Sequence, residues 1–322
     1  MTSTSCWPGA PRSAFLPRFP LANTFSIVAR DPETGCLGVA VQSHWFSVGA
    51  TVAWAEAGVG AVATQALAEV SYGPLGLALM RAAKPANEAL QALLSTDERR
   101  ELRQVAMIDA LGQVAVHTGA RCMADAGHEI GESFSVQANM MTSAEVWPAM
   151  AAAYRQAKGD FAGRLVSALE AGQAAGGDIR GQQSAAILIV AATSTGRPWI
   201  DTLMDLRVED HPAPIQELRR LVQIHRAYQL MNLGDEYLGM EETEKALEAY
   251  ASAAKLAPEM GEIPFWHAVT LADMGRLEEA LPIFKELFTA NPNWARLLQR
   301  LPPAGMMHAD HQTIQRILEL IG

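Results

Sequence analysis

The sequence predicts an α+β protein, in which a layered sandwich of sheets and helices is followed by a small all-α region of helical repeats. Short β-branched segments come in hairpin-like pairs and are followed by pairs of helical segments, an order that favours an α+β sandwich over a doubly wound βαβ fold. The segment 184–192 (SAAILIVAA) is apolar on both faces, so we expect a strand in the middle of a sheet that is covered on both sides. A helical pattern repeats in the last third of the chain.

The strands of the sandwich are expected to begin at Thr24, where the sequence changes from a proline-rich segment to β-branched runs. The expected strands are 24–30, 37–43, 48–54, 58–65, 103–109, 113–117, 133–139, 184–192 and 203–208. The turn sequence 31–35 (DPETG) joins the first two, and we expect the first three to form an antiparallel meander.

Helical spacing predicts helices over 73–83 and 86–94, two helices within 143–175 that are separated at 158–160 (KGD), and a helix over 214–230. Further on, small and aromatic residues recur about 34 positions apart, which is the tetratricopeptide period. The matched residues are Ala246, Tyr250, Ala253 and Pro258 with Ala280, Phe284, Leu287 and Pro292. Two such copies are fewer than the three or so that are usually stable, so we expect them to pack on the helix 214–230 and on a capping helix over 312–321. The expected organisation is a disordered leader or propeptide over 1–23, a sandwich over 24–226 and helical repeats over 227–322.

Composition excludes several classes of protein. The chain has 322 residues, with 25 Lys and Arg against 35 Asp and Glu, so its formal net charge is −10. A chain without a basic field is a poor ligand for nucleic acid or an anionic membrane surface, and we expect neither partner. Three cysteines at irregular spacing argue against a disulfide framework, and the leader lacks the apolar centre of a secretory signal, so we expect a cytoplasmic protein. We expect no metal or cofactor, since the chain contains no zinc-type, P-loop or dinucleotide-binding spacing.

Thr24 is the leading candidate for a nucleophile. If the bond before it were cut, its α-amine, with a reference pKa of about 7.7–8.0, would be a base within reach of its own hydroxyl. The alternative is that Thr24 merely begins a strand. Ser43 and His44 end the neighbouring strand, where His44 is either a general base or a strand-end histidine. Gln65 and Asn139 each end an apolar strand, where an amide either stabilises an oxyanion or bonds to the sheet edge.

A polar, glycine-rich loop over 176–184 (GGDIRGQQS) carries the candidate substrate-binding residues Asp178, Arg180 and Gln183. An Asp–Arg pair at a sheet edge either orients a substrate carboxylate or closes its own loop as an internal salt bridge. Both interpretations stay open on the sequence.

Eight ordered segments carry a resemblance to a known family. They are TFSIVARDPETG, LGVAVQSHWFSVGA, WAEAGVGAVATQA, SYGPLGL, HTGARC, FSVQANMM, GGDIRGQQSAA and DLRVEDHP. Over residues 24–226 the chain resembles the bacterial family known as domain of unknown function 1028. The resemblance implies the four-layer αββα sandwich of N-terminal-nucleophile (Ntn) hydrolases, with Thr24 at the position of the nucleophile. Two features depart from that class: residues 1–23 precede Thr24, and no lysine follows in the second or third strand.

The sequence thus supports two hypotheses. In the first, the protein is an Ntn-type amidohydrolase that acts on a small amide or peptide-like substrate after removal of the leader. In the second, the sandwich is catalytically inactive and the repeats, which resemble tetratricopeptide repeats, bind a protein partner. The sequence identifies neither the substrate nor the partner, and it leaves open whether the chain forms a homo-oligomer.

Overall fold

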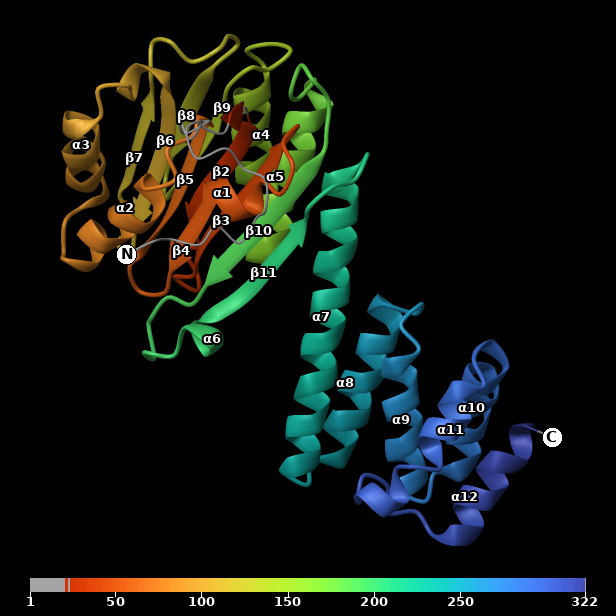
Figure 1. Ribbon diagram of the computed structural model, residues 1–322. Coiled ribbons are helices and arrows are strands. Elements are labelled where there is room, and N and C mark those ends of the chain that lie inside the picture. The colour runs from red at the N-terminus through yellow and green to blue at the C-terminus, as the bar shows by residue number, and fades with distance from the viewer. Residues whose placement is uncertain (1–20, 23, 322) are drawn as a thin grey trace, which may run out of the picture. The chain divides into compact units, whose positions relative to one another are not determined.

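A computed structural model of the chain describes residues 21–22 and 24–321 (Figure 1). The chain divides into two compact units between Arg219 and Arg220, which we call unit 1 and unit 2. This division falls within helix α7 (Pro214–Gly239), which also contains the expected boundary at 226. The expected leader lies largely outside the described residues, which exclude 1–20 and 23.

Unit 1 contains two antiparallel sheets. Sheet A has the order β1-β5-β6-β7. Strand β4 also pairs with β5, along residues 60–63, whereas β1 pairs with residues 66 and 67 of the same strand. Its strands are β1 (Leu21–Ala22), β4 (Ala53–Glu56), β5 (Gly60–Leu67), β6 (Arg103–Asp109) and β7 (Val114–Thr118). Sheet B has the order β11-β10-β3-β2-β9-β8. Its strands are β2 (Thr24–Arg30), β3 (Leu37–Ser43), β8 (Gly127–Gly131), β9 (Phe134–Ala138), β10 (Ser184–Val190) and β11 (Thr202–Val208).

The two sheets pack face to face, and helices cover their outer faces (Figure 1). Valines of β2 and β3 meet alanines and Ile108 of β5 and β6 in the core between the sheets. Helices α2 (Tyr72–Arg81) and α3 (Ala86–Thr96) pack on sheet A, whereas α4 (Val146–Gln156) and α5 (Phe161–Ala174) pack on sheet B. The layers therefore follow the order helices, sheet, sheet, helices. Shorter helices are α1 (Gly49–Val52), α6 (Pro198–Asp201) and the 3₁₀ turn Arg100–Leu102.

Local sequence explains where α5 begins and how closely it approaches sheet B. The Asp160 carboxylate caps the helix by accepting a hydrogen bond from the Gly163 N–H at 2.8 Å. A Cβ on Gly38 of β3 would lie 2.9 Å from side-chain carbons of Leu165 and Phe161. Glycine at position 38 therefore lets the helix pack directly on the strand.

The expected three-stranded meander is only half right. The β2–β3 hairpin forms with the expected antiparallel pairing, but residues 48–54 are not a third strand beside it. The Val48 N–H donates to Ser184 Oγ at 3.1 Å and Val52 N–H donates to Val48 O at 2.9 Å, so the backbone turns into helix α1 instead of entering a ladder. Strand β4 then joins sheet A.

Three other strands differ in some respect from what the sequence predicts. Strand β10 is paired on both sides, as expected, but it lies second from the edge because β11 pairs with it on the outside. Strand β8 was not expected, since its sequence GHEIG contains one β-branched residue and two glycines. The segment expected to be a disordered leader contributes β1, whose residues Leu21 and Ala22 pair with Leu67 and Ala66 of β5.

Unit 2 consists of helices. After the last part of α7 it contains α8 (Thr243–Leu256), α9 (Glu262–Asp273), α10 (Leu277–Ala290), α11 (Asn293–Leu298) and α12 (His311–Leu318), with 3₁₀ turns at Pro302–Ala304 and Glu319–Ile321. The repeating residues Ala246, Tyr250, Ala280 and Phe284 are all buried. A Cβ on Gly234 would lie 2.7 Å from the Tyr250 ring, so the small residue admits the aromatic side chain of the next helix.

Candidate functional site

Antiparallel pairing brings three of the expected site residues together where neighbouring strands of sheet B begin or end. We call this place the Thr24 edge. Thr24, the first residue of β2, pairs directly with Ser43, the last residue of β3. Asn139 follows the last residue of β9, and its backbone N–H donates to Thr24 O at 3.1 Å. Directly paired residues point to the same face of a sheet, so the Thr24 and Ser43 side chains share a face. Val28 and Val41 lie an even number of residues from Thr24 and Ser43, so their side chains are on the same face. Both valines lie in the core between the sheets, so this face is turned toward sheet A.

The carbonyl of Thr24 accepts hydrogen bonds from three N–H groups. Besides the backbone of Asn139, the donors are Asn139 Nδ2 at 3.3 Å and Gln65 Nε2 at 3.1 Å. Gln65 belongs to β5, so one donor reaches Thr24 from the opposite sheet. We call the Gln65 and Asn139 side chains, together with this carbonyl, the Thr24 clamp. Because all three residues are fully buried, no water replaces these bonds and the clamp fixes the backbone at Thr24.

The amide donors of Gln65 and Asn139 are already engaged in this structure, and their role in stabilising an oxyanion stays a prediction. Gln65 Nε2 also faces Gln104 Oε1 at 2.7 Å and the backbone oxygen of Gln137 at 3.3 Å. Asn139 Nδ2 also donates to Gln104 Oε1, at 2.9 Å. The amide protons of both side chains are thus occupied within the protein, as in the alternative interpretation of hydrogen bonding at the sheet edge. The Asn139 Oδ1 atom is buried and has no hydrogen-bond partner among the described residues.

Sequence reasoning missed three residues of the same polar cluster, which are Ser26, Gln104 and Gln137. Ser26 Oγ donates to Gln65 Oε1 at 2.6 Å, and Gln137 Nε2 donates to Ser26 Oγ at 2.6 Å. All three side chains are fully buried. The signal that was available is a polar residue at a core-facing position of an apolar strand, as with Ser26 in TFSIVAR and Gln104 in RQVAMID.

Asp178 and Arg180 form the internal salt bridge that was one of the two expectations. Arg180 donates to both carboxylate oxygens of Asp178, with Nε at 3.0 Å from Oδ1 and an Nη at 2.7 Å from Oδ2. The Asp178 side chain is fully buried, whereas that of Arg180 is 28% exposed. The loop adjoins the Thr24 edge, because Ile179 N–H donates to the carbonyl of Met140, which directly follows Asn139. A role in orienting a substrate carboxylate stays a prediction.

His44 and Gln183 lie at the same edge but contact other groups. The His44 backbone N–H donates to Asp178 Oδ2 at 3.3 Å, and its ring Nδ1 is buried without a partner among the described residues. His44 lies just beyond the last residue of β3. The Gln183 backbone N–H donates to Ser43 O at 3.1 Å, and its side chain donates to Asp210 Oδ1 at 3.0 Å.

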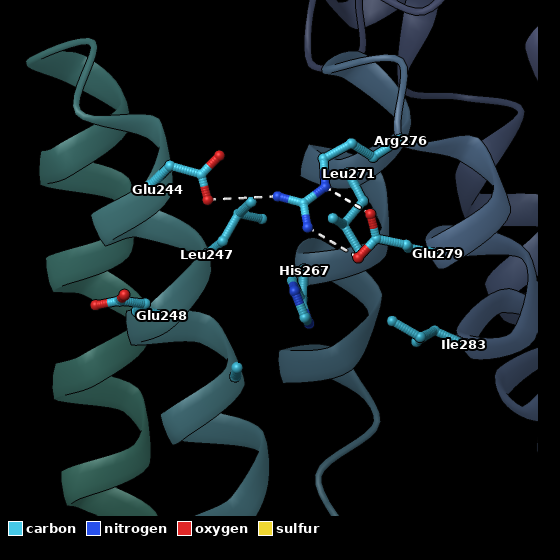
Figure 2. A pocket seen from close by; sticks show the side chains of 9 residues that line it. Glu244, Leu247, Glu248, His267, Leu271, Arg276, Glu279 and Ile283 are labelled. Atoms are coloured by element: carbon cyan, nitrogen blue, oxygen red, sulfur yellow. Dashed lines mark hydrogen bonds and ion pairs between the residues drawn. The ribbon is translucent and has the colours of Figure 1, made fainter.

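A second candidate surface is a groove in unit 2 with a volume of about 350 Å³, lined by helices α8, α9 and α10 (Figure 2). Leu247, Leu271 and Ile283 supply apolar side chains to it. On its rim, the Arg276 guanidinium bonds Glu279 at 2.7 Å and Glu244 at 3.5 Å (Figure 2).

His267 also lines the groove. Burial and the nearby Arg276 charge lower the pKa of His267 below its usual value of 6.5. The ring is therefore neutral at neutral pH.

The described residues show no group of three or more His, Cys, Asp or Glu side chains placed to hold a metal ion. Over the same part of the chain, no helix is both long and apolar enough to cross a membrane.

Fold and site together define a mixed α/β protein of two antiparallel sheets with a polar cluster at one sheet edge and a C-terminal helical region. The model of a family of unknown function, DUF1028, matches residues 24–218, and the chain belongs to this family. A tetratricopeptide-repeat model matches residues 230–260, which confirms a repeat of that kind in unit 2.

Among solved structures, the chain is similar to a crystal structure of a DUF1028 protein from Silicibacter pomeroyi. The two are 33% identical, the match covers 62% of this chain and 88% of that one, and the TM-score is 0.57. No curated protein matches the chain.

Proposed function

We propose that this protein is an amidohydrolase of the Ntn class, in which removal of residues 1–23 makes Thr24 the N-terminal nucleophile. The Thr24 clamp is the observation that carries the proposal. An N-terminal residue is usually poorly ordered unless something ties it down. Three N–H donors on its carbonyl hold Thr24 from its C-terminal side, so its position does not depend on the peptide bond that precedes it. The layer order and the family membership agree with the Ntn architecture that the sequence resemblance implies.

The reaction follows from two groups on one residue. The free amine of Thr24 takes the hydroxyl proton, and Oγ attacks the substrate's amide carbonyl to form a C–O bond. The C–N bond then breaks as the proton passes to the leaving amine, and water hydrolyses the resulting ester to return the hydroxyl. Ser43 is the hydroxyl residue paired with Thr24, and we assign the orientation of a substrate to the loop of Asp178 and Arg180, which bonds the segment after Asn139.

The comparison that tests this proposal uses the full-length chain and a chain that starts Met-Thr24, from which methionine removal exposes the threonine. Circular dichroism first checks that both forms fold. We expect only the shorter form to hydrolyse members of a panel of small amides and acylated amino acids, because the peptide bond before Thr24 blocks the amine of the longer one. A full-length chain that hydrolyses equally well with residues 1–23 attached contradicts the proposal. So does a folded short form that hydrolyses none of them.

A second candidate function concerns unit 2, where we propose that the groove binds a segment of a protein partner. Its combination of apolar side chains with charged groups on the rim supports this, as does the tetratricopeptide match. With unit 1 inactive, this binding would be the function of the whole chain.

A photoreactive residue at Ala251, which lines the groove, tests the binding proposal against one at Met240, which is 65% exposed and does not line it. We expect a partner to be cross-linked from position 251 alone. Equal cross-linking from both positions contradicts a specific groove.

A further inference from the structure

We infer that Gln104, on the sheet opposite Thr24, is a positioning residue that aims both amides of the Thr24 clamp at the Thr24 carbonyl, together with the other groups that bond Gln65. Its part in a reaction rests on the proposed function. Its part in holding Thr24 rests on hydrogen bonds alone.

The orientation of Gln104 is dictated by backbone carbonyls. Its Nε2 donates to the Ala138 carbonyl at 2.9 Å and also faces the Gly127 carbonyl at 3.1 Å. A carbonyl accepts and never donates, so only the NH₂ end of the amide fits there. Thr118 Oγ1 accepts from the same Nε2 at 2.9 Å. Gln104 Oε1 must therefore point the other way, toward the clamp.

That oxygen in turn fixes the two clamp amides. Gln104 Oε1 accepts from Gln65 Nε2 at 2.7 Å and from Asn139 Nδ2 at 2.9 Å. Either amide turned by 180° would present its oxygen to the oxygen of Gln104 and lose its bond to Thr24 O. One acceptor thus aims two donors at the same carbonyl.

Burial makes this chain of bonds obligatory. Gln65, Gln104, Asn139 and Thr24 are all 0% exposed, so water cannot take the place of a missing partner. A buried polar group without its partner is costly, and neighbouring bonds in such a network depend on one another. Loss of the Gln104 amide should therefore weaken the hold on Thr24. The effect should be larger at Asn139, because Gln65 Nε2 also faces the Gln137 carbonyl and Gln65 Oε1 accepts from Ser26 Oγ.

The test uses the full-length chain with three variants. Gln104→Met removes the acceptor and keeps a side chain of similar length. Gln104→Glu keeps an acceptor, but its ionised second oxygen would face the two backbone carbonyls, and only its protonated form can donate to them. Gln137→Met is the matched control, because Gln137 is equally buried and its side chain bonds Ser26 and Ser135. It reaches the clamp only indirectly, through the Ser26 hydroxyl that donates to Gln65.

The readout is hydrogen-exchange protection of the Asn139 backbone N–H, which donates to Thr24 O, measured against mid-strand amides of β2. We expect Gln104→Met to lower this protection about tenfold, and Gln137→Met to change it by less than about threefold. In Gln104→Glu the protection should be low at about pH 8 and return toward the parent value at about pH 5, because burial favours the protonated carboxyl. A general loss of core stability would also vary with pH, but it would change the protection of the mid-strand amides of β2 as well, so a recovery confined to Asn139 indicates the positioning role.

Unchanged protection in a folded Gln104→Met chain overturns the inference, and so does an equal loss in Gln137→Met. If Gln104→Met fails to fold, Gln104→Glu decides, and protection without pH dependence overturns the inference. A different result would contradict the proposed function while leaving this inference intact. Should protection respond as expected while the folded chain that starts at Thr24 hydrolyses nothing, Gln104 holds Thr24 but no reaction follows.

Discussion

Thr24→Ala is expected to lower amide hydrolysis by the form that starts at Thr24 by about 10³-fold or more, because alanine keeps the amine and removes the attacking hydroxyl. The Gln65 and Asn139 amides donate to the backbone carbonyl of Thr24 and not to its side chain, so the substitution leaves these hydrogen bonds in place. Initial rates on the amide panel measure the effect.

Thr24→Ser is the matched control for this change. Serine retains both the hydroxyl and the amine, so we expect hydrolysis to persist. An alanine variant whose rate stays within about tenfold of the parent would exclude Thr24 as the nucleophile.

In unit 2, Phe265→Ala is expected to lower the free energy of unfolding by about 3–5 kcal/mol, which is the usual cost of removing a buried aromatic ring. Phe265 is fully buried, and its ring centroid lies 4.9 Å from that of Trp294 and 6.1 Å from that of Phe284. The alanine leaves a cavity between these rings. Urea unfolding followed by tryptophan fluorescence measures the loss.

Met240→Ala in the same unit provides the comparison. Its side chain is 65% exposed, so a change within about 0.5 kcal/mol is expected. Similar effects of the two substitutions would show that Phe265 is not part of a packed core.

The parts of the fold that could be predicted are those that local sequence determines. The β2–β3 hairpin has a strong turn sequence between two β-branched runs, and its pairing follows from them. Residues 48–54 look like a strand by composition, but a hydrogen bond from Val48 to the distant Ser184 sends the backbone into a helical turn. That contact depends on where β10 lies, which local sequence does not contain.

The candidate site also has a part that could be predicted from local sequence and a part that could not. Thr24, Ser43 and Asn139 could be placed together because the ends of neighbouring antiparallel strands meet at one edge. The role of Gln65 and the existence of Gln104 in the site depend on how sheet A stacks on sheet B. No spacing within the chain encodes that stacking, so the sequence does not show that these two amides bond the Thr24 carbonyl.

The most direct test of Thr24 as the nucleophile is mass spectrometry of the N-terminal peptide from the hydrolysing form of the protein, taken during turnover of a slow amide substrate. The proposed function predicts a peptide that begins at Thr24 and carries the substrate's acyl group as an ester on that residue. Hydrolysis by a chain whose first residue is not Thr24, or an acyl group on any other side chain, would contradict it.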